Sequence, residues 1–147
     1  MSTPLRSDLI KEFKKDVCEA LNPLRRSWDK LKEKPIPLIL DKEKNLDELE
    51  PWEALTSRFA RVTDIFLSKF IRLKVLELDP GFRGEMRDLL DKAEKTGLVT
   101  NADQWMKIRE LRNKISHEYT TEDLRKTFED IIKLTPFVLE ELKEFKS

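Results

Sequence analysis

The sequence predicts an all-α fold, an up-and-down bundle of four to five helices in a single domain over residues 1–147. The chain holds only three glycines and is rich in Leu, Glu and Lys, which are good helix formers. Its apolar residues recur every three or four positions, with almost none of the alternation that strands show. A length of 147 residues suits one domain with its own core, and short connections imply antiparallel neighbouring helices.

The first helix is expected to begin at Thr3, with Pro4 in its first turn. Its apolar residues recur four positions apart: Leu5, Leu9, Phe13, Val17 and Leu21. The Asn22-Pro23 pair should break or kink this helix, and residues 24–33 form a shorter continuation. A loop follows over residues 35–46, and its apolar side chains are expected to pack back on the bundle: Ile36, Leu38, Ile39 and Leu40.

The second long helix is predicted over residues 51–78, with two apolar sides. The predicted core side carries Leu55, Phe59, Val62, Phe66, Phe70 and Leu73. The opposite side carries Ser57, Arg61, Asp64, Ser68 and Arg72, and beside them in the C-terminal half run Leu67, Ile71, Val75 and Leu78. A helix that is apolar on two sides needs two partners, so we expect this second strip to form a homodimer surface.

A third helix is expected over residues 82–96, closed by Gly97 in a left-handed conformation. A fourth should run from the cap Asn101 to about Glu118, with a buried stripe of Trp105, Ile108, Leu111 and Ile115. The last begins after Thr120, and Pro136 should kink it. Its inward residues are predicted to be Leu124, Phe128, Ile131, Ile132, Val138, Leu142 and Phe145. The three tryptophans, Trp28, Trp52 and Trp105, are interpreted as core anchors.

Charge and cysteine content limit the function classes. Lys plus Arg and Asp plus Glu balance at 29 each, so nucleic-acid binding would need a local basic patch. Cys18 is the only cysteine, which excludes an intramolecular disulfide, and its spacing indicates a small buried hydrophobic residue. One histidine and one cysteine far apart do not make a zinc site, and no motif indicates a cofactor. No export signal or membrane-spanning run is apparent, which favours a cytoplasmic protein.

A polar cluster is predicted on the fourth helix, in the run from Leu111 to Tyr119 that contains the chain's only histidine, His117, and only tyrosine. At about 100° per residue, Arg112 and Tyr119 lie nearly in line at the edge of the apolar stripe. Asn113 and His117 form the adjacent row, four residues apart. A rigid helix with its other face in the core would hold these side chains toward a ligand.

This set of residues is suited to cleaving RNA without a metal. A histidine with a near-neutral pKa can take the proton of a ribose 2′-hydroxyl or donate one to the leaving 5′-oxygen. An arginine stabilises the charge that grows on the phosphate. Because one histidine cannot easily be both acid and base, a symmetric dimer that brings two copies of His117 to one cleft is the attractive arrangement.

The spacing of Arg112 and His117 in this run resembles the Arg-x4-6-His signature of the HEPN superfamily. With Tyr119 included, the run is similar to the R-x4-H-x-Y motif of the HepT-like toxins. The resemblance implies a homodimeric, metal-independent endoribonuclease toxin that cuts RNA such as tRNA or mRNA at the dimer interface. It assigns catalysis to Arg112 and His117, and substrate positioning to Asn113 and Tyr119. It also implies a minimal nucleotidyltransferase as antitoxin, with AMP transfer to Tyr119 as the neutralising modification. Asp64 or Arg61 is a candidate for the family's remaining polar residue.

Two other interpretations stay open. The chain could be a non-catalytic HEPN subunit that binds a nucleotide or the nucleotidyltransferase. It could also be an interaction protein in which the motif is structural, with Arg112 paired to Glu110, Glu118 or an acid on a neighbouring helix, and Tyr119 packed on the next helix. Under the structural interpretation, Arg61 and Asp64 form a solvated or interface ion pair.

Overall fold

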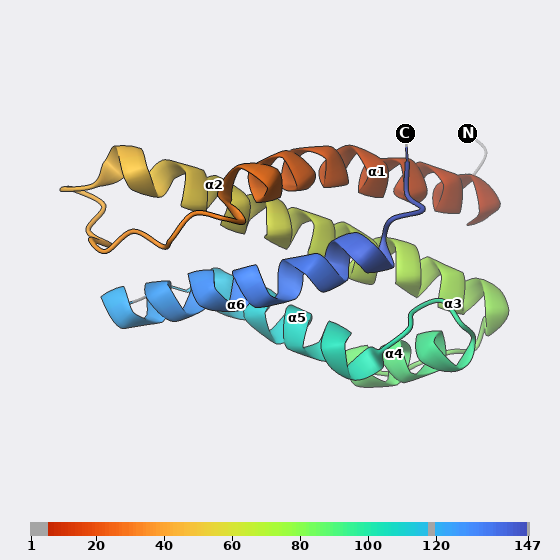
Figure 1. Cartoon of the computed structure of the whole chain (residues 1–147). Helices are drawn as coiled ribbons and strands as arrows, with labels where there is room; N and C mark the ends of the chain where they lie inside the picture. Colours follow the sequence, from red (N-terminus) through yellow and green to blue (C-terminus); the bar gives the residue numbers. More distant parts are fainter. Residues whose placement is uncertain (1–5, 118–119, 147) are drawn as a thin grey trace, which may run out of the picture.

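The computed structural model describes residues 6–117 and 120–146, and every regular element in those ranges is helical. Figure 1 shows them along the chain. The elements are α1 (Arg6–Leu31), α2 (Leu46–Thr63), the π-helical segment η1 (Asp64–Ile71), α3 (Arg72–Leu78), α4 (Met86–Lys95), α5 (Ala102–Ile115) and α6 (Thr121–Glu141). The predicted all-α class is therefore confirmed for the described part of the chain.

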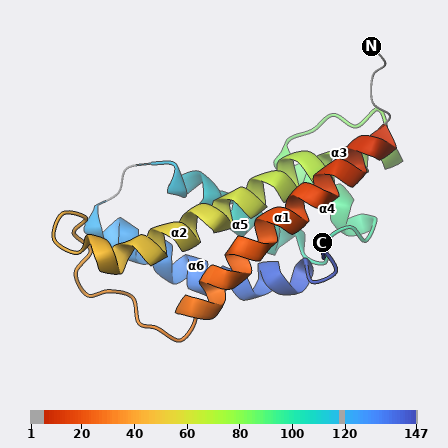
Figure 2. The ribbon, with the colours of Figure 1, turned by 90° about the horizontal axis from the view of Figure 1, so that it is seen from above.

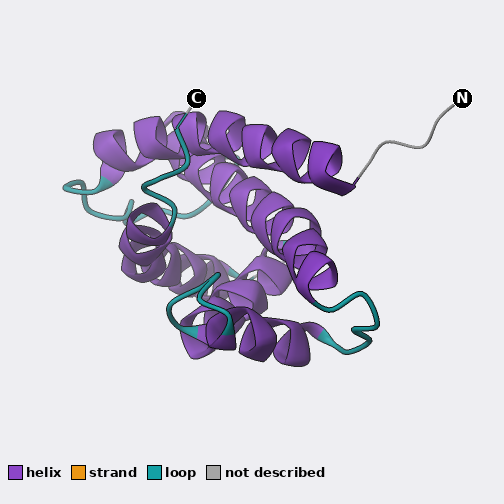
Figure 3. Cartoon of the chain, turned by 90° about the vertical axis from the view of Figure 1, so that its right-hand side faces the viewer, coloured by secondary structure: helices purple, strands orange, loops and turns teal. Residues whose placement is uncertain are grey.

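The long helices run up and down. In Figures 1 and 2, α1 runs one way, the continuous rod α2–η1–α3 returns, α5 runs back and α6 returns again. The short helix α4 precedes α5 and packs against it. Seen from the end, the helices surround a common interior (Figure 3). That interior holds the core, to which all the long helices contribute buried apolar side chains.

In the described part of the chain, three prolines lie inside helices without interrupting them. Pro23 lies within α1, Pro51 within α2 and Pro136 within α6. The expected break at Pro23 is absent, and α2 begins five residues before Pro51, at Leu46. A proline costs a helix about 3 kcal/mol, whereas each fully buried leucine contributes about 1.5–3 kcal/mol. Leu21 and Leu24 are both fully buried beside Pro23, so packing outweighs the lost hydrogen bond.

The prediction that a second apolar strip of the long helix forms an exposed dimer surface is wrong. Leu67, Ile71 and Val75 are buried inside the single chain, and only Leu78 is exposed. The reason is η1, because a π-helix pairs residues five apart and so holds more residues in each turn than an α-helix. The buried face therefore rotates around the helix axis toward these three residues. Leu73, which was predicted to lie on the core side, is partly exposed.

Aromatic contacts fix the rod against the C-terminal helices. The ring of Phe66 on η1 lies 4.7 Å from that of Trp105 on α5, centroid to centroid. Trp52 on α2 lies 5.5 Å from Phe128 on α6. Trp52 and Trp105 are thus confirmed as core anchors, whereas the third tryptophan, Trp28, is only partly buried. These contacts hold α2 against α6 and η1 against the first half of α5.

The predicted helix ends are confirmed at several points. Gly97 has a φ of 78°, the left-handed conformation expected after α4. The Asn101 side chain accepts the Gln104 N–H at 3.0 Å, and Thr120 caps α6 by accepting from Asp123. The helix predicted over residues 82–96 is α4, and it begins later than predicted, at Met86. The Asp88 carboxylate accepts the Glu85 N–H at this helix start. Cys18 is buried, as its spacing indicates.

The connection between α1 and α2 packs on the bundle only in part. Leu40 is buried and Ile36 partly so, but Leu38 and Ile39 are 89% and 57% exposed, against expectation. The Arg125 guanidinium on α6 donates to the Leu38 carbonyl at 3.0 Å, so a side chain of the bundle holds the backbone here while the Leu38 and Ile39 side chains are exposed. Within the described residues no helix is long and apolar enough to cross a membrane.

Candidate active site

The helix that carries the motif ends earlier than predicted. Its last residue is Ile115, and the next two N–H groups, of Ser116 and His117, bond three residues back to Asn113 and Lys114. Such tight bonds close a helix by using carbonyls that its last turn leaves unpaired. His117 therefore lies past the helix and is exposed, and the predicted row of Asn113 and His117 on one helix face is wrong.

Among the described residues of the motif, Arg112 makes the most side-chain hydrogen bonds. Its Nε and Nη2 donate to Oδ1 and Oδ2 of Asp64 at 2.7 and 2.9 Å, a two-pronged contact. Its Nη1 donates to Ser116 Oγ at 2.7 Å. Planar guanidinium and carboxylate groups match in this geometry, which fixes orientation as well as distance. Arg112 thus pairs with an acid on a neighbouring helix, an alternative left open by the sequence, and Asp64 pairs with it rather than with Arg61.

The ion pair is a positioning device more than a source of stability. The side chains of Arg112 and Asp64 are 26% and 49% exposed. Pairs open to water contribute about 0–1 kcal/mol to folding. Asp64 is the first residue of η1, two positions before the Phe66 ring that packs on Trp105 of α5. The packing of Phe66 on Trp105 therefore fixes the backbone of η1 and holds the Asp64 carboxylate toward α5.

Arg112 lines a basic groove between the rod and α5. The groove has a volume of about 600 Å³, and its lining includes Arg61, Lys69 and Arg112 against the carboxylate of Asp64. Three cations and one anion give this surface a local positive charge, although the whole chain is neutral. A groove of this kind is suited to a phosphate-bearing ligand.

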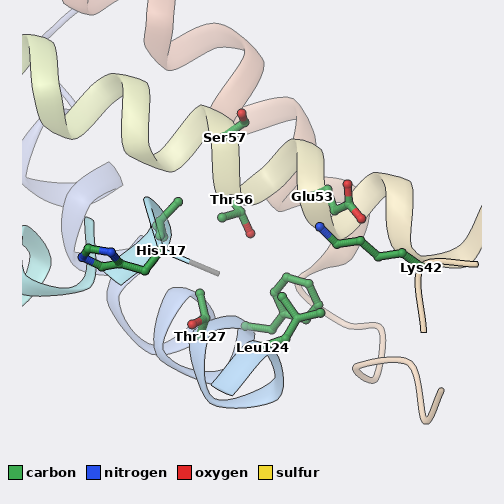
Figure 4. A pocket seen from close by; sticks show the side chains of 9 residues that line it. Lys42, Glu53, Thr56, Ser57, His117, Leu124 and Thr127 are labelled. Carbon is green, nitrogen blue, oxygen red and sulfur yellow. The ribbon is translucent and has the colours of Figure 1, made fainter. Parts of the chain in front are cut away.

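His117 lines a different pocket, next to the groove. This pocket has a volume of about 550 Å³ and lies between α2, the end of α5 and the start of α6. Ser57 and Ile115 line both the pocket and the groove, so Arg112 and His117 lie on adjoining surfaces without sharing one. In Figure 4, His117 is at one end of the pocket, while Lys42 and Glu53 are at the other.

Of the other predicted site residues, the structure describes Asn113 and not Tyr119. Asn113 is exposed on the last turn of α5, where its backbone carbonyl accepts the Ser116 N–H. Tyr119, predicted for substrate positioning and as the modified residue, lies outside the described residues, as does Glu118. Across residues 6–117 and 120–146, no group of three His, Cys, Asp or Glu side chains is arranged to hold a metal ion.

Sequence reasoning missed the far end of the His117 pocket. Lys42 comes from the connection before α2, and Glu53 lies on α2 beside the core residue Trp52. Lys42 carried no local signal, since it is one of several charged residues in a polar stretch. Glu53 carried no distinctive signal either, since it is one of three glutamates in the sequence of α2.

Comparison of the chain with protein-family models, with curated proteins and with solved structures found no match in any of the three. The geometry of the groove and pocket is therefore the basis for a functional conclusion.

Proposed function

We propose that the chain is a HEPN-like, metal-independent endoribonuclease of the HepT type, acting as a homodimer. The observation that supports this best is the orientation of Arg112 by Asp64 in a groove that also holds Arg61 and Lys69. A fixed guanidinium among other cations is suited to a phosphodiester, which carries one negative charge per nucleotide and gains charge during cleavage. The resemblance of the motif to that of the HepT-like toxins agrees with this chemistry.

In the proposed reaction, the ribose 2′-oxygen forms a bond to phosphorus while the bond from phosphorus to the 5′-oxygen breaks. A base takes the 2′-hydroxyl proton and an acid donates a proton to the 5′-oxygen, so the products are a 2′,3′-cyclic phosphate and a 5′-hydroxyl. His117 serves as one of these groups, and the His117 of a second copy supplies the other. Arg112 stabilises the charge on the phosphate oxygens, and Asn113 and Tyr119 position the substrate.

The antitoxin in this proposal is a minimal nucleotidyltransferase, which neutralises the toxin by transferring AMP to the Tyr119 hydroxyl. Both partners, the second copy and the nucleotidyltransferase, follow from the resemblance. The dimer also has a chemical reason, since each chain carries a single histidine. The buried Leu67–Val75 strip does not provide the contact, so the dimer surface is expected next to the groove, where both copies reach one RNA strand.

A second candidate function is a non-catalytic HEPN subunit that binds a nucleotide or the nucleotidyltransferase. The observation that favours it is that Arg112 and His117 line adjoining surfaces and not a shared one. Binding by such a subunit does not require Arg112 and His117 to contact the same phosphate.

Expression of the chain alone in a bacterial host separates these two functions. A ribonuclease toxin is expected to arrest growth, and Arg112→Ala is expected to abolish the arrest without lowering the amount of folded protein. Lys114→Ala, an exposed cation on the same helical turn, is the matched control and should remain toxic. Normal growth on expression of the wild-type chain would contradict the toxin and favour the binding subunit.

A further inference from the structure

Ser57 on α2 lines both the basic groove and the His117 pocket. The sequence places it in one polar row with Arg61 and Asp64, at intervals of four and three residues, and all three side chains line the groove. Helical spacing explains this arrangement, since residues three and four positions apart share one face. Ser57 therefore lies where the two cavities adjoin, and the proposed reaction assigns it no role.

The Ser57 hydroxyl is accessible to a ligand. Two neighbouring residues use their hydroxyls inside the helix, because Thr56 and Thr63 donate to carbonyls four residues back at 2.9 Å each. Among the described residues, Ser57 makes no such side-chain bond, and it is exposed. Figure 4 shows Thr56 directed into the pocket and Ser57 at the edge, one position further along α2. A serine hydroxyl in this position can donate to a phosphate oxygen.

The charges of the two linings favour phosphate on one side of Ser57 and a nucleoside on the other. In the groove, the Asp64 carboxylate is paired with Arg112. Arg61 and Lys69 then add two positive charges, and the described lining of the groove holds no other acid. The pocket lining instead holds one lysine against one glutamate, with apolar side chains from the end of α5 and from α6. A phosphate is therefore favoured on the groove side, and a sugar with its base on the pocket side.

The sizes of the two cavities suit a single strand. Their volumes, about 600 Å³ for the groove and about 550 Å³ for the pocket, are typical of sites for small organic ligands. Each cavity can therefore hold a short stretch of one strand, whereas a duplex would have to lie over the rims. Single-stranded RNA also exposes its bases, which can then enter a pocket.

We propose that Ser57 is a further substrate-binding residue, whose hydroxyl donates to a non-bridging oxygen of the phosphate at the boundary between groove and pocket. The strand passes between Ser57 and Ile115, the two described residues that line both cavities. Arg112 binds this phosphate from the groove side, and His117 meets the attached ribose on the pocket side. The inference rests on the proposed function, and it explains how residues that line separate cavities act on one phosphodiester.

Equilibrium binding of a short 2′-deoxy oligonucleotide, which lacks the attacking hydroxyl, tests this assignment without cleavage. Ser57→Ala is expected to bind about tenfold more weakly, the lower end of the range for a hydrogen bond to a charged group, because the site is open to water. Ser57→Thr keeps the hydroxyl and should bind as the wild type does. Fluorescence anisotropy measures the affinities, and melting curves should be unchanged because the side chain is exposed.

Ser68→Ala is the matched control and should bind like the wild type. Ser68 is an exposed serine of the same predicted polar row, and it lines neither cavity. Wild-type affinity in Ser57→Ala would overturn the assignment, as would an equal loss in Ser57→Thr or in Ser68→Ala. Absence of binding by the wild-type chain would overturn it as well.

These outcomes are distinct from failure of the proposed function. A chain whose oligonucleotide affinity depends on the Ser57 hydroxyl but that cuts no RNA retains the binding residue and loses the nuclease. A chain that cuts RNA, and whose Ser57→Ala variant binds and cuts as the wild type does, retains the nuclease and loses the binding residue.

Discussion

His117→Ala is expected to lower kcat/KM for cleavage of single-stranded RNA by about 10²–10⁴-fold, the usual contribution of a general acid or base. The loss should be this large because the chain holds no second histidine to replace it. His117 is exposed and lies past the end of α5, so the substitution should leave folding within about 0.5 kcal/mol of wild type. Initial rates on a fluorescent oligoribonucleotide, with melting curves for each protein, measure both effects.

The matched control for His117→Ala is Lys114→Ala, an exposed side chain on the last turn of the same helix. Its rate should stay close to that of the wild type. A His117→Ala protein with wild-type activity would remove the histidine from the mechanism, and with it the chemical argument for a dimer.

Arg112→Ala is expected to lower kcat by about 10²–10³-fold, the usual cost of removing one group that stabilises charge in a transition state. KM should change less, because Arg61 and Lys69 still line the groove that binds phosphate. Arg112→Lys should restore only part of the rate, since an ammonium group cannot make the two-pronged contact with Asp64. Steady-state kinetics at several RNA concentrations separate the two parameters.

Asp64→Asn supplies the control for Arg112, because it keeps the cation and weakens its orientation. A loss of about tenfold or less is expected, with stability changed by no more than about 1 kcal/mol for so exposed a pair. If Arg112→Ala and Asp64→Asn instead lower the melting temperature equally while cleavage persists, the pair is structural and the catalytic assignment of Arg112 fails.

Helix periodicity predicted the fold because it depends on local spacing and apolar area. The buried stripe of α5, from Trp105 to Leu111, follows directly from that spacing. Helix periodicity gave the wrong core side in the rod α2–η1–α3. Phe66, Leu67, Phe70 and Ile71 are all apolar there, and nothing local distinguishes an α-helix from the π-helical segment η1. The segment η1 packs against α1, and its Phe66 ring packs against Trp105 of α5; these contacts lie far away in the sequence, so local spacing does not report them.

The candidate site was predictable in its composition and not in its geometry. The motif singled out Arg112 and His117, but no glycine or proline marks the end of α5, so the helix was extended past His117 in error. The contact between Arg112 and Asp64 joins residues 48 positions apart, and it depends on the rotation of two helices about their axes. The pocket that His117 lines likewise depends on segments far apart in the chain, since Lys42, α2 and α6 all contribute to its walls.

Incubation of the purified wild-type chain with single-stranded RNA in excess EDTA, followed by mass analysis of the product ends, tests the central claim most directly. The proposed mechanism predicts cleavage that leaves 2′,3′-cyclic phosphate and 5′-hydroxyl ends, since the 2′-hydroxyl is the attacking group and no metal takes part. Intact RNA under these conditions, or cleavage that needs a divalent ion and leaves 3′-hydroxyl ends, would contradict it.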